Sequence, residues 1–169
     1  LGVANADEGI QLRVSGIIVP IIILSPSPVG EIPEIIKYGL TPSVSDFHFA
    51  EELQGYCRKA GIRLPIHIEV DTGMGRGGIL CSEASEIIKK IVEFSNLFVE
   101  GIFSHLSCSE KLVVYNNQQW TLFRELLGGL AEAGIRIPIR HMSNSGGILN
   151  YPAFNMDMVR PGLMSYGIY

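Results

Sequence analysis

Strand-like and helix-like segments alternate along the 169 residues, and this alternation is what most limits the possible folds. The strand-like segments are short and rich in β-branched residues, a composition typical of strands buried on both faces. Most of them are followed by a segment with apolar residues at helical spacing. Repeated β-α units predict a parallel sheet covered by helices. The predicted strands are residues 1–4, 20–24, 41–45, 64–71, 97–104, 137–142 and 156–160.

Helices are predicted between these strands by apolar spacing and by capping residues. Asp46 and Ser82 have the side chains that commonly cap helix N-termini, and Gly61 is suited to a helix C-terminus. The predicted helices cover residues 7–14, 31–38, 46–59 and 117–133, and a further one opens at residue 82.

The segment Ile66–Asp71 favours one of the two folds that β-α units build, a doubly wound sheet or a (β/α)8 barrel. Side chains alternate between the faces of a strand, so one face is apolar and the other carries His67, Glu69 and Asp71. A barrel accepts polar side chains near its mouth, where such enzymes keep their active sites. We therefore predict an α/β protein with a TIM-type (β/α)8 barrel. A complete barrel needs roughly 250 residues, so we expect an incomplete one.

Composition and charge exclude several classes of protein. The net charge is −4 and no basic stripe occurs, so nucleic-acid binding has no electrostatic support. The longest apolar run, residues 16–24, is too short to span a membrane. Cys57, Cys81 and Cys108 show no C-x-x-C spacing, and we interpret them as reduced thiols of a cytoplasmic protein. Both ends fall within strand-like segments, and we expect the chain to be a fragment of a longer protein.

The glycine-rich segment Gly73–Gly78 follows the Ile66–Asp71 strand and matches the G-x-G-x-x-G pattern of dinucleotide-binding loops. Glu100, 22 residues after Gly78, stands where a ribose-binding acid would be expected. However, three residues separate the last glycine from the predicted helix, whereas the helix of a dinucleotide fold begins within the glycines. A plain glycine loop is therefore an equally good interpretation.

Two further sets of residues could bind a ligand. His67, Glu69, His105 and His141 could form a metal site of the kind found in barrel hydrolases, although no H-x-H or H-x-x-E-H spacing supports it. The segments 144–147 and 160–163 combine a hydroxyl with exposed backbone N–H groups after the last two strands. Barrels frequently bind phosphate at this place. Each loop alone could be only a turn, but together they favour a phosphate site.

Several motifs, in this order and at these separations, resemble the alanine racemases, barrel enzymes that use pyridoxal 5′-phosphate (PLP) to interconvert L- and D-alanine. The matching blocks are Leu1–Ala4 with Glu8, Gly9, Leu12 and Arg13; Val70–Arg76; Gly101–His105; Asn144–Ser145; and Val159–Gly162 with Tyr166 and Gly167. The resemblance implies that residues 1–169 are a partial PLP-binding barrel domain with strands 2 to 8 present and the first strand missing. It also implies a cytoplasmic homodimer that supplies D-alanine for peptidoglycan.

The resemblance assigns roles to particular residues. Arg76 would reach the PLP phenolic oxygen and the substrate carboxylate, and His105 would lie beside the ring and hydrogen-bond Arg160. Arg160 would face the pyridine nitrogen; since arginine keeps its proton, that nitrogen would stay unprotonated and the ring would be a weaker electron sink. Ser145 and the backbone N–H groups of Gly162 and Leu163 are implied to bind the cofactor phosphate, and Asn144 is also implied to bind the cofactor.

This sequence departs from the family in three places. Glu69 stands where many members have a carbamylated lysine, and we expect its carboxylate to orient Arg76 instead. The K-A-N-A-Y-G-H-G type block with the cofactor lysine does not occur, nor does the C-terminal β domain that supplies a catalytic tyrosine. We therefore expect the isolated chain to be inactive. Alternatives are a serine or broad-specificity racemase of the same fold, a metal-dependent barrel hydrolase, and a non-catalytic barrel.

Overall fold

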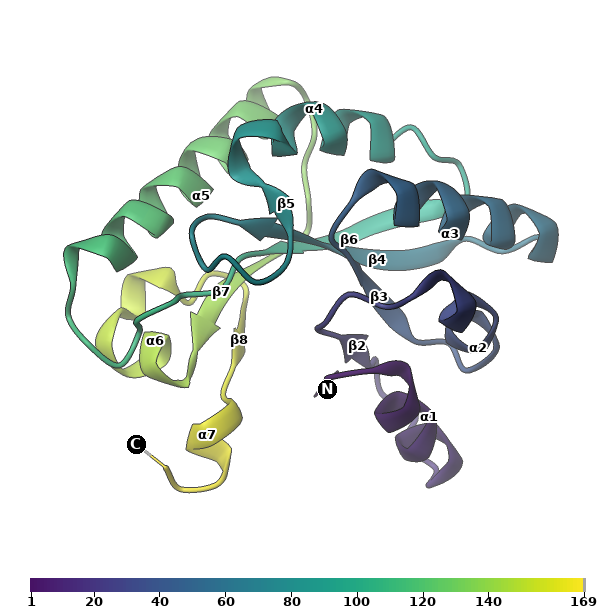
Figure 1. Cartoon of the computed structure of the whole chain (residues 1–169), viewed down its shortest axis with the longest axis horizontal. Coiled ribbons are helices and arrows are strands. Elements are labelled where there is room, and N and C mark those ends of the chain that lie inside the picture. Colours follow the sequence, from purple (N-terminus) through teal and green to yellow (C-terminus); the bar gives the residue numbers. More distant parts are fainter. Residues whose placement is uncertain (169) are drawn as a thin grey trace.

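The computed structural model describes residues 1–168, and in these residues one parallel sheet curves into an arch with helices on its outer side (Figure 1). The strand order is β1-β2-β3-β4-β6-β7-β8, and every pairing between neighbours is parallel. The first and last strands of this order are not paired with each other in the described residues, so the barrel is open between them. The predicted incomplete (β/α)8-type barrel is thus confirmed.

All seven predicted strands are present. Most of them are shorter than predicted, above all the strands at the two edges of the sheet. An eighth strand, β5, was not predicted; its two residues follow the glycine loop and pair with the end of β4. The strands are β1 (Gly2–Val3), β2 (Ile22–Ile23), β3 (Thr41–Val44), β4 (Leu64–Asp71), β5 (Ile79–Leu80), β6 (Leu97–Phe103), β7 (Ile139–Asn144) and β8 (Met158–Arg160).

The five predicted helices are also present, and Asp46 and Gly61 cap α3 as expected. The Asp46 side chain accepts a hydrogen bond from the Phe49 N–H, and Gly61 ends the helix with φ of 67°. Ser82 is not a cap, because the chain passes from β5 directly into α4. The helices are α1 (Ala6–Val14), α2 (Ile32–Lys37), α3 (Phe47–Ala60), α4 (Cys81–Ile91), α5 (Val114–Glu132), α6 (Ser145–Asn150) and α7 (Gly162–Ser165), with short 3₁₀ turns at Val29–Glu31 and Pro152–Phe154.

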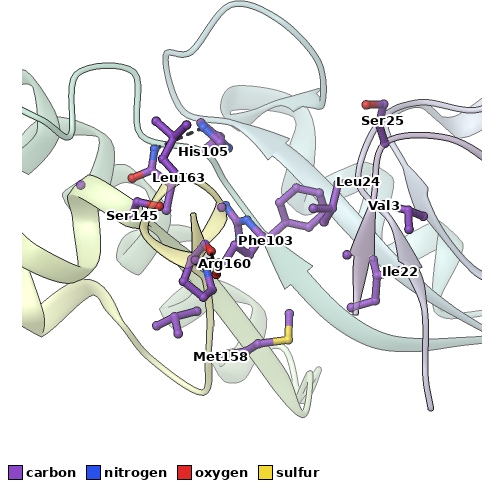
Figure 2. A pocket seen from close by; sticks show the side chains of 18 of the residues that line it. Val3, Ile22, Leu24, Ser25, Phe103, His105, Ser145, Met158, Arg160 and Leu163 are labelled. Carbon is purple, nitrogen blue, oxygen red and sulfur yellow. Dashed lines mark hydrogen bonds between the residues drawn. The ribbon is translucent and has the colours of Figure 1, made fainter. Parts of the chain in front are cut away.

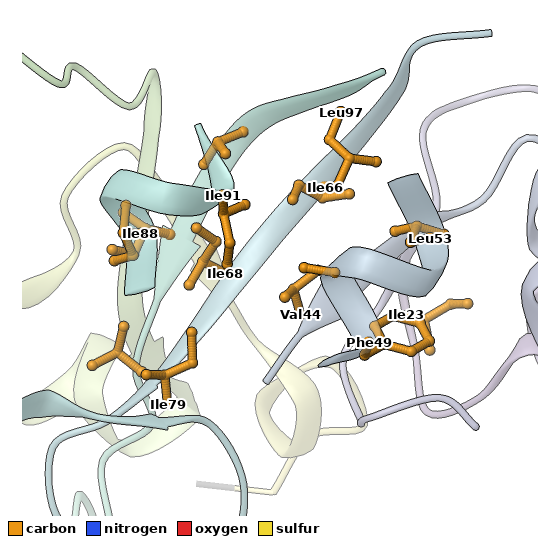
Figure 3. Packing of buried hydrophobic residues seen from close by; sticks show 14 of the residues in the cluster. Ile23, Val44, Phe49, Leu53, Ile66, Ile68, Ile79, Ile88, Ile91 and Leu97 are labelled. Carbon is orange, nitrogen blue, oxygen red and sulfur yellow. The ribbon is translucent and has the colours of Figure 1, made fainter. Parts of the chain in front are cut away.

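The main hydrophobic core lies between the sheet and its helices. Ile66 and Ile68 of β4 are fully buried and point toward the apolar side chains of α3 and α4 (Figure 3). On these helices Leu53 and Ile88 are likewise completely buried. The outer face of β4 therefore packs against helices, as the alternation of its side chains predicted.

The other face of β4 carries its polar residues toward the inside of the arch. His67 is fully buried and Glu69 nearly so, whereas Asp71 at the end of the strand is partly exposed. The three cysteines are free thiols. None of the helices in residues 1–168 is both long and apolar enough to cross a membrane.

Candidate functional site

A cavity of about 1220 Å³ opens where the strands of the arch end. It lies between the β1–β2 flank, which contributes Val3 and Ile22, and the β8 flank, which contributes Arg160 (Figure 2). All eight residues predicted to form the site line this one cavity, although they come from the ends of four different strands. These residues are Glu69, Arg76, His105, Asn144, Ser145, Arg160, Gly162 and Leu163.

Arg160 is held by the strands on either side of it. Its Nη2 donates to the carbonyl oxygens of Ser104 (2.7 Å) and Met142 (3.2 Å), and its Nη1 hydrogen-bonds Nδ1 of His141. In the described residues its Nε–H has no hydrogen-bond partner in the protein. Burial lowers the pKa of Arg160 to about 10, with Glu69 opposing this shift, so the guanidinium remains charged at neutral pH. The cavity therefore has a fixed cation with one unused donor.

The histidine that contacts Arg160 is His141, and the predicted pairing of His105 with Arg160 is wrong. His141 lies in β7, whose neighbour β8 ends at Arg160, so their side chains meet across two adjacent strands. His105 lies in the loop after β6, and its Nε2 is 3.3 Å from Nδ2 of Asn144. Burial, reinforced by the Arg160 charge, lowers the pKa of His105 to about 4. His105 is thus neutral at pH 7 and accepts from Asn144.

Glu69 faces the cavity from β4 and hydrogen-bonds Ser45. Its Oε2 accepts from the Ser45 hydroxyl at 2.8 Å. Burial raises the pKa of Glu69, whereas the Ser45 hydrogen bond and the charges of Arg76 and Arg160 lower it. No ion pair joins Glu69 directly to Arg76 in the part of the chain that the structure describes. The expected orientation of Arg76 by Glu69 therefore stays a prediction.

The loop that carries Arg76 is fixed by hydrogen bonds at its base. Asp71 accepts from the backbone N–H groups of Gly73 (2.8 Å) and Gly75 (3.1 Å), and the Tyr115 hydroxyl donates to the Gly73 carbonyl (2.8 Å). Both glycines have positive φ, which other residues rarely adopt. Arg76 is exposed at the tip of this loop and lines the cavity.

The glycine loop does not have the geometry of a dinucleotide-binding motif. Strand β5 follows the last glycine, and α4 begins only at Cys81, so no helix N-terminus lies within the glycines. Glu100 is near His67, with 3.5 Å between its Oε2 and the His67 Nε2. The structure thus favours a plain glycine loop that displays Arg76.

The loops predicted to bind phosphate meet at one side of the cavity. The Ser145 hydroxyl, at the start of α6, accepts from the N–H of Met164 in α7 at 3.0 Å. Asn144 caps α6 by accepting from the Gly147 N–H at 3.0 Å. The first N–H groups of a helix have no partner within that helix, and the space beside Gly162 is open. A hydroxyl and helix N–H groups without a partner in their own helix, in a cavity that two arginines also line, are chemically suited to a phosphate ester.

The metal-site interpretation has no cluster of ligands to support it. Across the described residues, no group of three or more histidine, cysteine or carboxylate side chains is arranged to hold a metal ion. His67 and His141 instead bond each other, with 2.8 Å between Nδ1 and Nε2. The sequence drew attention to both histidines but not to their pairing, because the pairing depends on strand register.

Comparison with known proteins identifies the family. A family model described as "Alanine racemase, N-terminal domain" matches residues 1–169. The chain is 40% identical to an alanine racemase of Halothermothrix orenii over 169 residues, and 43% identical to that of Thermodesulfovibrio yellowstonii over 167 residues. These matches cover 99% of the chain in both cases, but only 45% and 44% of the two relatives. The chain thus spans about half the length of the curated relatives it matches.

Solved structures agree with the sequence comparison. The alanine racemase of Clostridium difficile 630 superposes with a TM-score of 0.97 at 31% identity, over 100% of this chain and 47% of that one. An alanine racemase from Bacillus anthracis with bound L-Ala-P gives a TM-score of 0.90 at 29% identity, over 100% and 44% of the two chains. The protein therefore belongs to the alanine racemase N-terminal domain family.

Proposed function

We propose that the whole protein is a PLP-dependent alanine racemase and that this chain forms most of its cofactor-binding barrel. The observation that carries the proposal is the Nε–H of Arg160, a fixed donor that no group in residues 1–168 accepts from, at a cavity lined by all the predicted site residues. The relatives that match nearly all of the chain are named alanine racemases. When bound, PLP would supply an electron sink that makes the α-hydrogen of an amino acid removable.

Arg160 would set the strength of this electron sink. Its guanidinium remains protonated at neutral pH even though burial lowers its pKa to about 10. A ring nitrogen that accepts a hydrogen bond from Arg160 would stay unprotonated, because arginine does not give up its proton. The weaker withdrawal of electrons would favour return of the proton to carbon over side reactions such as transamination. His105 is neutral at pH 7, so it would lie beside the ring without adding a second positive charge there.

The remaining cavity residues would hold the two anionic groups of cofactor and substrate. The Ser145 hydroxyl and the N–H groups of Gly162 and Leu163 would bind the phosphate, with Asn144 fixing the start of α6. Arg76 would bind the substrate carboxylate and the phenolic oxygen, because a guanidinium matches a carboxylate with two parallel donors.

Racemisation needs an acid–base group on each face of the α-carbon. We propose that these groups, a lysine and a tyrosine, lie in other parts of the protein, the tyrosine in a C-terminal β domain of a second subunit. The active protein would then be a cytoplasmic homodimer that makes D-alanine for peptidoglycan. The 169 residues alone would be inactive.

The experiment uses the protein expressed from the complete reading frame. We expect an absorbance band at roughly 420 nm, typical of PLP joined to a lysine, and borohydride reduction followed by peptide mapping should locate that lysine outside these residues. Racemisation of L-alanine and L-serine would be measured side by side to separate the alanine enzyme from a broader racemase. A colourless protein that binds no PLP would contradict the proposal.

The role of Glu69 needs a separate test. Intact mass should show no carbamate at this position, since a carboxylate already provides the negative charge. We expect Glu69→Gln to lower kcat/KM for alanine, because the amide keeps a hydrogen-bond acceptor for Ser45 but loses the charge felt by Arg76. Unchanged kinetics would exclude an electrostatic role for Glu69.

A further inference from the structure

A row of polar side chains leads from the cavity into the interior of the barrel. Arg160 hydrogen-bonds Nδ1 of His141, and Nε2 of His141 is 2.8 Å from Nδ1 of His67. Nε2 of His67 is in turn 3.5 Å from a carboxylate oxygen of Glu100. Both histidines are completely buried, whereas the Glu100 side chain is one-third exposed on the far side. The row therefore joins a residue of the cavity to a carboxylate outside it.

The chemistry of the two ends fixes the direction of every hydrogen bond between them. A guanidinium only donates, so Nδ1 of His141 must accept and its proton must be on Nε2. That N–H donates to Nδ1 of His67, which leaves the His67 proton on Nε2 as well. In the described residues this N–H makes no hydrogen bond, and the Glu100 carboxylate faces it at 3.5 Å, farther than an ordinary hydrogen bond. An ionised carboxylate only accepts, so the far end has the complementary polarity.

Two features of the backbone bring Glu100 and His67 together. In the pairing of β4 with β6, Ile66 is opposite Val99 and His67 is opposite Gly101, so Glu100 is an extra residue in β6. Such a bulge redirects a side chain that a regular strand would point elsewhere. Gly101 leaves the space that the imidazole occupies, since a Cβ there would lie 2.3 Å from the His67 ring. The bulge and the glycine are independent observations, and both serve the same contact.

We propose that Glu100 is a positioning residue for Arg160, acting through His67 and His141 in a chain of hydrogen bonds with a single direction. The Glu100 carboxylate attracts the His67 Nε2–H, which keeps both imidazoles in the Nε2–H form and leaves the His141 lone pair facing the guanidinium. Arg160 is thereby held in place from the side away from the cavity. The consequence for catalysis rests on the proposed function, whereas the protonation pattern does not.

The first test is ¹⁵N NMR of the full-length protein with labelled histidine, prepared without cofactor. We expect His67 and His141 to be neutral with their protons on Nε2, and a coupling across the hydrogen bond between His141 Nε2 and His67 Nδ1. A proton on Nδ1 of either residue, or a second proton on either ring at pH 7, would overturn the proposal. This measurement needs no variant and no catalytic activity.

The second test compares Glu100→Gln with Glu100→Leu. The glutamine oxygen can still accept from His67, so the Nε2–H forms and the coupling should be retained. Leucine offers no acceptor; we expect the His67 signals to shift, the coupling to weaken and kcat/KM to fall by roughly tenfold, as for partners that orient site residues in metalloenzymes. Glu93→Gln, an exposed acid after α4, is the charge-matched control and should change nothing.

The outcomes separate this proposal from the proposed function. If Glu100→Leu folds and leaves both the His67 signals and the kinetics unchanged, Glu100 has no positioning role. If the full-length protein has no racemase activity but both histidines show the predicted protonation, the hydrogen-bond chain stands and the assigned reaction is wrong. If Glu100→Leu does not fold, the wild-type spectrum and Glu100→Gln decide the question.

Discussion

The two faces of β4 differ in the interactions that hold their side chains in place. The outer face places Ile66, Ile68 and Val70 in the hydrophobic core, where any well-shaped apolar neighbour suffices. The inner face carries His67, whose stabilisation depends on a particular partner at a particular distance. One strand thus supports the fold through non-directional burial and shapes the cavity through directed hydrogen bonds. Substitutions on the two faces should differ in size and in their dependence on pH.

The largest effect is expected on the outer face. Ile68→Ala removes a fully buried side chain from the core between β4 and its helices and should lower the free energy of unfolding by about 2–5 kcal/mol. Urea unfolding at pH 7 and at pH 5 would measure it, and the loss should be the same at both pH values. Val92→Ala, at a residue that is 39% exposed, is the control and should cost less than about 0.5 kcal/mol. A similar cost for both variants would contradict the assignment of the core.

The inner face should lose stability in acid. Burial lowers the pKa of His67 to about 4 and also lowers that of His141. Below pH 6.5 the unfolded chain therefore binds protons at these residues that the folded protein does not bind. The contribution of neutral His67 to the free energy of unfolding is fully present above pH 6.5. It falls by on the order of 3 kcal/mol as the pH drops from 6.5 to about 4. Unfolding measured across this range should show the loss. His48→Asn, at an exposed site on α3, should retain the full pH dependence, whereas His67→Gln should reduce it.

This difference between the faces also marks how far the sequence could predict the structure. Apolar alternation is enough to place the outer face of β4, and the resemblance to the alanine racemases is enough to name site residues that line one cavity. The choice of His141 over His105 as the partner of Arg160 depends on strand register, which shifts between His141 and Asn144. No local pattern encodes such a shift. For the same reason the contact between Glu100 and His67, produced by a bulge, was not foreseen.

A smaller effect is expected where the inner face meets its neighbouring strand. In Gly101→Ala the new methyl group would lie 2.3 Å from the His67 ring, which is buried and bonded to His141. We expect a loss of about 1–3 kcal/mol in the free energy of unfolding, typical of overpacking. Gly128→Ala in α5 is the matched control, because nothing lies within 4 Å of its Cβ position; it should stabilise the protein by about 0.4–1 kcal/mol. If the two variants behave alike, the imidazole can move aside and the inner face is looser than its hydrogen bonds suggest.

The smallest effect on stability should come from the end of the same strand, where the inner face becomes the Arg76 loop. Asp71→Ala removes the acceptor for the N–H groups of Gly73 and Gly75 and should cost about 1 kcal/mol, since the site is partly exposed. Its local effect should be larger: the amides of both glycines should exchange with solvent faster, while those of Ile66 and Ile68 stay protected. Asp71→Asn, which retains one carbonyl acceptor, should give intermediate exchange. Unchanged exchange in Asp71→Ala would mean that the hydrogen bond from Tyr115 to Gly73 is sufficient to hold the loop. In that case the position of Arg76 would depend on α5 rather than on β4.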